Sequence, residues 1–158
     1  ADPSFTDHDT GGVIIQPRTM WVSGVNKKWS SDISFKRITD GTSNTIFVGE
    51  KHAMEQWLGW FPSDSSIFNG NHLESMARFA GLEDLNDPSS PQYPITQGPN
   101  DETSPNISSL FGSWPPAIGH FCFRDGSTTI LSNCSDVQVL GLLSQRADGR
   151  TMDKTATR

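Results

Sequence analysis

The chain has little positive charge and no long apolar run, and each shortage argues against a class of function. Its 158 residues include 12 basic and 18 acidic ones, for a formal net charge of −6. Nucleic-acid backbones are bound through basic patches, so nucleic acid is not expected as a partner. No apolar stretch reaches the length that spans a bilayer, so we expect no membrane-spanning segment within these residues.

The common catalytic motifs are also missing. Neither the Gly-x-Ser-x-Gly nucleophile elbow nor the Gly-x-x-x-x-Gly-Lys phosphate loop occurs. His-Glu-x-x-His and Cys-x-x-Cys are absent as well, which argues against zinc. The run Asp7-His8-Asp9 offers hard metal ligands, but it lies near a terminus, where a solvated end is expected. We therefore expect no enzymatic activity and no cofactor.

Cysteine is scarce, and the two that occur leave two states open. Cys122 and Cys134 allow at most one disulfide. A bridge needs Cα atoms about 5.5–6 Å apart, and Cys134 lies too far along a straight strand after Asp125 to reach Cys122. A fold-back at Ser132 would bring the two together. Both a bridge and two separate buried thiols therefore stay open.

The residues that are plentiful indicate a loop-rich, mainly β protein. The chain has 14 Gly and 10 Pro with a hydrophobic fraction of 34%. Its 5 Trp and 9 Phe argue against disorder, because disordered chains are poor in aromatic residues. The length suits one domain over 1–158. We expect the α+β class, with a mainly antiparallel sheet and a C-terminal helix.

Short β-rich segments broken by turns predict the strands. Strands are expected at 12–15, at 19–22, in an alternating run from 33 to 38, and at 44–50. A further hairpin is expected around Asp125-Gly126. A two-residue turn there would place Phe123 opposite Thr128 and Phe121 opposite Ile130, all on the core face.

Helix and loop signals complete the predicted layout. Asn71 is expected to cap a short helix through about Ala80 that Gly81 ends. Ser135-Asp136 is expected to cap a helix near 135–147, with Gly149 as its stop. The polar segment 83–106 predicts a long surface insertion, and 150–158 a solvated tail.

Two Asp-Gly pairs carry the strongest residue-level predictions. Gly41 and Gly126 are expected at positive φ, where a Cβ would clash. Asp40 and Asp125 are expected to accept hydrogen bonds from the backbone N–H groups just after them. The same two aspartates are candidate calcium ligands, although plain turns are the favoured interpretation. The predicted structural motif consists of Asp40, Gly41, Asn44, Glu50, Asp125 and Gly126.

Two further groups are candidates for chemistry or binding. Glu50 and His52 alternate along a predicted strand and would share one face, but with no third partner we favour structural hydrogen bonding. Trp57, Trp60 and Phe61 are either part of the core, which we favour, or an exposed aromatic platform for a glycan, because flat rings stack on apolar sugar faces.

Three segments resemble one known family. These are Ile38-Thr-Asp-Gly-Thr-Ser-Asn-Thr-Ile-Phe-Val-Gly-Glu50, the stretch from Phe111-Gly-Ser through Phe121-Cys-Phe-Arg-Asp-Gly-Ser127, and Leu143-Ser-Gln-Arg-Ala-Asp-Gly149. The resemblance extends over Ile38–Glu50 and Phe111–Gly149, about a third of the chain. They resemble the planctomycete-type prepilin-like proteins, whose C-terminal region is a domain of unknown function. The chain departs from the family's signature at Pro115, where a His is usual, and has His120 where Asn is usual.

The resemblance implies a type IV pilin-like head domain of an exported protein. Such proteins begin with a prepilin peptide and a hydrophobic helix, and this helix would be the only link to a membrane. We expect a non-enzymatic pilin- or pseudopilin-like subunit or cell-surface component, located outside the cell, at its surface or in the periplasm. Its expected partners are protein subunits of a pilus-like or secretion assembly. A glycan- or ligand-binding module is the alternative. Ala1–Pro3 is either a cloning scar or the trimmed edge of a longer protein.

Overall fold

A computed structural model describes residues 18–22, 25–30, 34–60, 64, 66, 77–101, 109–147 and 149–150. All its strand-to-strand pairings are antiparallel, and one α-helix follows the last strand, within these residues. The predicted α+β class is therefore confirmed. The elements are β1 (Arg18–Val22), β2 (Val25–Ser30), η2 (Phe35–Arg37), β3 (Ile46–Gly49), η3 (Glu55–Trp57), β4 (Gly81–Leu82), β5 (Gln92–Tyr93), β6 (Ile118–Phe123), β7 (Thr128–Ser132) and α2 (Val137–Ser144).

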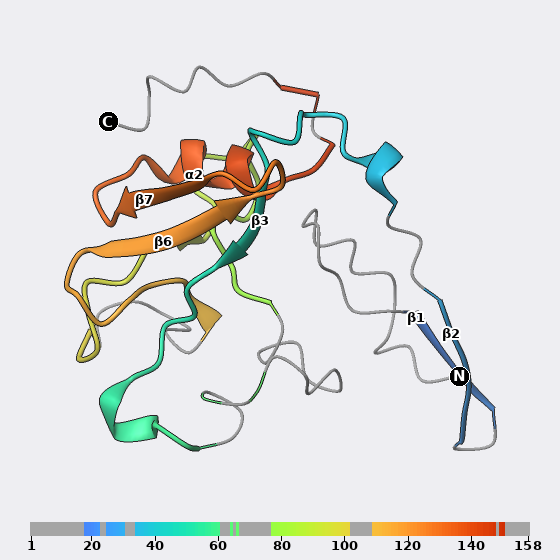
Figure 1. The fold of residues 1–158 in the computed structure, drawn as a ribbon, viewed down its shortest axis with the longest axis horizontal. Coiled ribbons are helices and arrows are strands. Elements are labelled where there is room, and N and C mark those ends of the chain that lie inside the picture. Colours follow the sequence, from blue (N-terminus) through green and yellow to red (C-terminus); the bar gives the residue numbers. More distant parts are fainter. Residues whose placement is uncertain are drawn as a thin grey trace.

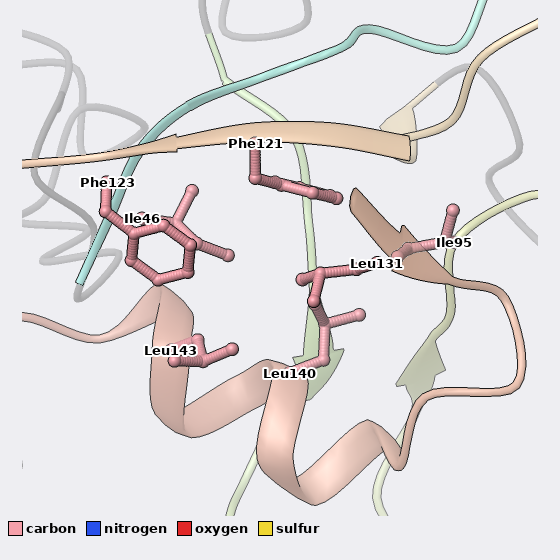
Figure 2. Packing of buried hydrophobic residues seen from close by; sticks show 7 residues of the cluster. All are labelled: Ile46, Ile95, Phe121, Phe123, Leu131, Leu140 and Leu143. Carbon is pink, nitrogen blue, oxygen red and sulfur yellow. The ribbon is translucent and has the colours of Figure 1, made fainter. Parts of the chain in front are cut away.

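A three-stranded sheet in the order β3-β6-β7 forms the centre of the fold, with α2 packed against one face (Figure 1). The inner face of β6 carries Phe121 and Phe123, because alternate residues of a strand point to the same side. Leu140 and Leu143 lie on one side of α2 and meet these rings. Figure 2 shows the resulting core, which consists of Ile46, Ile95, Phe121, Phe123, Leu131, Leu140 and Leu143.

The β6–β7 hairpin forms at the predicted place but in a different register. Phe121 pairs with Thr129, not with Ile130, and Cys122 pairs with Thr128. The N–H of Phe123 bonds the carbonyl of Ser127 at 2.8 Å, so the loop contains three residues, Arg124 to Gly126, rather than two. A three-residue loop with glycine at positive φ is a common hairpin connection. This shift of one residue leaves Ile130 56% exposed and puts Leu131 in the core.

Several other predicted elements need correction. The strand expected from 33 to 38 is replaced by η2, in which the N–H of Arg37 bonds the carbonyl of Ser34 at 3.0 Å. The structure describes residues 77–80 of the helix expected at 71–80, and they are not helical. Phe79 instead pairs with Leu110, and its N–H bonds the carbonyl of Ser109 at 2.8 Å. The predicted strand at 19–22 is confirmed within β1, and that at 44–50 within β3. The strand expected at 12–15 and the rest of that helix lie outside the described residues.

The C-terminal helix is confirmed but is shorter than predicted. Asp136 caps it by accepting a hydrogen bond from the N–H of Gln138 at 2.7 Å. The helix ends at Ser144, so the expected extension to 147 is wrong, and Gly149 is not its stop. Beyond the helix, the carbonyl of Arg146 accepts a bond from a distant segment instead of continuing the helical pattern.

The expected surface insertion at 83–106 is only partly a surface segment. Residues 83–89 are mostly exposed, but β5 pairs with β4, and Tyr93, Ile95 and Thr96 are buried. Ile95 belongs to the main core. Gly81 at the start of β4 lies directly against Gly141 of α2, so a side chain at position 81 would overlap the helix backbone.

Candidate functional site: the junction of the three motifs

The first two motifs meet through their backbones. The N–H of Asp125 donates to the carbonyl of Thr42 at 3.1 Å, and the N–H of Arg124 donates to the carbonyl of Thr45 at 3.2 Å. The loop of the β6–β7 hairpin therefore lies beside the loop that precedes β3. The two Asp-Gly turns, distant in the sequence, form one structural unit.

The third motif joins the same unit. The N–H of Thr39 donates to the carbonyl of Arg146 at 2.9 Å, and the N–H of Gly149 donates to the Asp40 carboxylate at 3.0 Å. Arg146 itself is 7% exposed. We call this meeting point of the segments 39–45, 124–127 and 146–149 the motif junction.

The two aspartates of the motif junction do different things. Asp125 accepts bonds from the N–H and the hydroxyl of Ser127, at 2.9 and 2.6 Å, and so stabilises its own turn as expected. Asp40 instead accepts the bond from the N–H of Gly149, far along the chain, in addition to one from the Thr39 hydroxyl at 3.4 Å. Gly41 and Gly126 have φ values of 95° and 85°, as the Asp-Gly pairs predict.

Asn44 and Glu50, the remaining members of the predicted motif, also have structural contacts. The N–H of Asn44 bonds the carbonyl of Gly41 at 3.1 Å and closes the turn, and the Thr45 hydroxyl bonds the same carbonyl at 3.0 Å. Glu50 accepts bonds from the N–H and Nδ1 of His120, at 2.9 and 2.6 Å. The sequence motifs therefore meet a second time, at the other end of β3.

Glu50 and His52 do not form the pair that their spacing suggests. β3 ends at Gly49, so the two residues are not part of one regular strand. Glu50 is exposed and bonds His120, whereas His52 is 1% exposed and its Nδ1 lies 3.0 Å from the hydroxyl of Thr96. Thr96 was not predicted to matter because it lies in the segment expected to be a surface insertion.

His52 is a buried group whose pKa is shifted by its surroundings. Burial lowers the pKa of His52, the nearby Asp101 carboxylate opposes this shift, and the Arg78 guanidinium adds to it. Its Nε2 is buried and has no hydrogen-bond partner among the described residues. The neutral imidazole is therefore the form that this environment favours.

Among the described residues, no three His, Cys, Asp or Glu side chains gather into a metal-binding group. The run Asp7-His8-Asp9 lies outside the described residues. Turn and junction bonds account for the positions of Asp40 and Asp125, and the lack of a role for calcium stays a prediction.

The tryptophans expected to fill the core are exposed. Trp57 is 41% exposed and Trp60 is 71% exposed, so the core interpretation is wrong for both. Their loop is held by Asp64, which accepts the N–H of Gly59 at 2.9 Å and pairs with Lys51 at 3.1 Å. These two contacts also lower the pKa of Asp64, with the Gly59 bond the larger cause. Phe61 lies outside the described residues.

A further exposed tryptophan, which sequence analysis did not single out, lies near this loop. Trp114 is 48% exposed, and its indole N–H donates to the carbonyl of Ala53 at 3.1 Å. Ala53 precedes η3, which carries Trp57. The sequence Trp114-Pro-Pro indicates this exposure, because an aromatic residue before two prolines is more typical of a loop than of a core strand.

Both cysteines are free thiols. Cys122 pairs with Thr128 at the start of β7, and Cys134 follows the end of that strand. The strand alone separates these positions by about 13 Å, at about 3.3 Å per residue. This distance is far beyond the reach of a disulfide.

No helix in the described part of the chain is long and apolar enough to cross a membrane. Neither the curated proteins nor the solved structures contain a significant match to this chain. A family model described as "Protein of unknown function (DUF1559)" matches residues 2–138. This span covers most of the 158 residues and includes the first two motifs of the junction. The chain therefore belongs to this family of proteins of unknown function, DUF1559.

Proposed function

We propose that this chain is the head of a non-enzymatic, exported, type IV pilin-like or pseudopilin-like subunit, or a cell-surface component of that kind. The proposal draws on the resemblance of Ile38–Glu50, Phe111–Ser127 and Leu143–Gly149 to planctomycete-type prepilin-like proteins. Membership of a family of unknown function is compatible with it.

One observation carries the proposal. The segments that resemble the prepilin-like family are joined to one another mainly through backbone hydrogen bonds, at the motif junction and at the Glu50–His120 contact. Among the described residues, their polar side chains bond neighbouring turns and backbone groups. This bonding of the motif residues to the protein itself supports an architectural role, because a catalytic site needs polar groups directed at a substrate.

The sequence upstream of Ala1 in the intact gene product provides the most direct test. A prepilin cleavage site followed by a hydrophobic helix is expected there. The full-length protein, imaged and fractionated from its native cell, should be in the envelope or outside the cell and in an assembled form. A version without the hydrophobic helix is the control and should not assemble. A full-length protein that is uniformly cytoplasmic and unassembled would contradict the proposal.

A second candidate function, glycan binding, is favoured by the exposure of Trp57 and Trp60. Trp114, anchored at Ala53, would extend such a platform. Titration with soluble oligosaccharides, followed by tryptophan fluorescence, should show saturable binding that Trp57→Ala and Trp60→Ala weaken. Phe35→Ala is the control, because Phe35 is 81% exposed but lies on η2 instead. Equal binding by all three variants would rule out this platform.

A further inference from the structure

β7 is an edge strand of the central sheet. The strand order is β3-β6-β7, so β6 covers one edge of β7, and Figure 1 shows β7 as the outermost strand on its side. An edge strand presents unpaired N–H and C=O groups that can pair with another chain. Proteins usually protect such edges with charges, prolines or bulges.

The hydrogen-bond pattern identifies the groups that face outward. The N–H of Phe123 donates to the carbonyl of Ser127 at 2.8 Å, and the N–H of Asn133 donates to the carbonyl of Ala117 at 2.9 Å. Both bonded pairs consist of odd-numbered residues. The odd-numbered residues of β7 therefore direct their backbone groups toward β6. Bonded and non-bonded pairs alternate along an antiparallel ladder. The N–H and C=O groups of Thr128 and Ile130 therefore point away from the sheet. They have no hydrogen-bond partner among the described residues.

Within the described residues, β7 itself carries none of the side chains that usually protect an edge. β7 reads Thr-Thr-Ile-Leu-Ser and contains no charged residue and no proline. Its pairing with β6 is regular over all five residues, without a bulge. The Ile130 side chain is 56% exposed, and Leu131 alone of the strand is buried.

We propose that β7 pairs edge to edge with β7 of a second copy of this chain, in an antiparallel, two-fold symmetric dimer. The strand is self-complementary about Ile130. With Ile130 on the two-fold axis, its outward N–H and C=O bond those of Ile130 in the second copy. Thr128 then lies opposite Ser132 of the second copy, which pairs two hydroxyl residues.

The side chains favour this occupant over an unrelated strand. The exposed isoleucines form an apolar cross-strand pair, and such pairs stabilise antiparallel strands. No like charges oppose each other across the pair, because β7 has none. Two-fold symmetry repeats the Thr128–Ser132 pair on both sides of the axis. The inference concerns the head itself and does not depend on the proposed pilin-like function.

Sedimentation analysis of the 158-residue chain, from low micromolar to millimolar concentration, tests the proposal. A monomer–dimer equilibrium is expected. Ile130→Lys places two positive charges at the axis and should raise the dissociation constant about tenfold or more. Ile130→Val keeps the apolar pair and should dimerise like the original chain. Val48→Lys is a matched control, because Val48 is 41% exposed on the same face of the sheet but on the opposite edge strand.

Residue-resolved hydrogen exchange tests the pairing on the original chain, so its result does not depend on how a substitution affects folding. The outward amides of Thr128 and Ile130 should become protected as concentration rises, whereas Thr129 and Leu131 should be protected throughout. A chain that stays monomeric up to millimolar concentration would overturn the proposal. So would a dimer that persists in Ile130→Lys, or one that Val48→Lys disrupts equally, since the latter would indicate pairing of faces. Failure of the pairing would leave the localisation test of the proposed function unaffected.

Discussion

The N–H of Asp125 donates a hydrogen bond to the carbonyl oxygen of Thr42, at 3.1 Å. This bond joins the loop of the β6–β7 hairpin to the turn before β3. Together with the contacts of Arg146 and Gly149 it closes the domain from three distant parts of the chain. The stability of the fold should therefore depend on turn residues that are only partly buried.

Two glycines with nearly the same φ should differ sharply in their tolerance of alanine. Gly126 has φ of 85° and no atom near its missing Cβ, so Gly126→Ala should cost only the backbone strain, about 1–2 kcal/mol. Gly81 has φ of 84°, and a Cβ there would lie 2.1 Å from the N of Gly141. Gly81→Ala should therefore cost about 3 kcal/mol or more, because α2 must shift away. Urea unfolding of both variants measures the difference, and equal costs would contradict the close packing at Gly81.

Removal of the Asp40 carboxylate should release the C-terminal end of the motif junction. Asp40→Ala loses the acceptor for the N–H of Gly149, so limited trypsin digestion should cleave after Arg146 or Arg150 faster than in the original chain. Asp40→Asn keeps an oxygen acceptor and serves as the control. The cost in global stability should be modest, about 1 kcal/mol. Unchanged cleavage rates in Asp40→Ala would show that this bond does not hold the segment.

Acid should destabilise the fold through His52. Burial lowers the pKa of His52 in the folded state, so the unfolded chain binds the proton more readily. The free energy of unfolding should therefore fall as pH drops below about 6.5, the unfolded pKa, by up to about 1.4 kcal/mol per pH unit. At higher pH both states are neutral and this contribution no longer changes.

His52→Gln tests this assignment, because glutamine does not titrate. The variant should lose the part of the pH dependence of stability that His52 causes below about 6.5, whatever its absolute stability. His120→Gln is the comparison variant, because His120 is the other histidine among the described residues. If both variants keep the full pH dependence, another group causes it.

Calcium should not stabilise the Asp-Gly turns. Asp125 accepts two hydrogen bonds from Ser127, and loss of its carboxylate in Asp125→Ala should cost about 1 kcal/mol. In thermal melts, added calcium should leave the Tm of the original chain unchanged. It should likewise leave the Tm of Asp125→Asn unchanged. A Tm that rises with calcium in the original chain, and not in Asp125→Asn, would assign the aspartates to an ion site.

The features that follow from neighbouring residues could be predicted from the sequence. Positive φ at Gly41 and Gly126 arises from the Asp-Gly pairs themselves, and the cap at Asp136 requires only the N–H two residues later. These interactions are local, so the residues that make them are adjacent in the sequence.

The features that depend on distant partners could not be predicted. The three-residue hairpin loop is accompanied by a bond from Arg124 to the carbonyl of Thr45, and without that contact a two-residue turn was equally reasonable. Glu50 bonds His120 and not His52 because β6, a distant strand, brings His120 alongside. The burial of Ile95 was likewise hidden in a segment whose composition is mostly polar.

The position of α2 after every strand has a consequence for how the fold forms. Leu140 and Leu143 complete the core, and they follow Phe121, Phe123 and Leu131 in the chain. Until α2 is available, the core lacks Leu140 and Leu143, the two leucines that complete it. A partly synthesised chain that lacks α2 should therefore expose apolar core residues and be prone to aggregation.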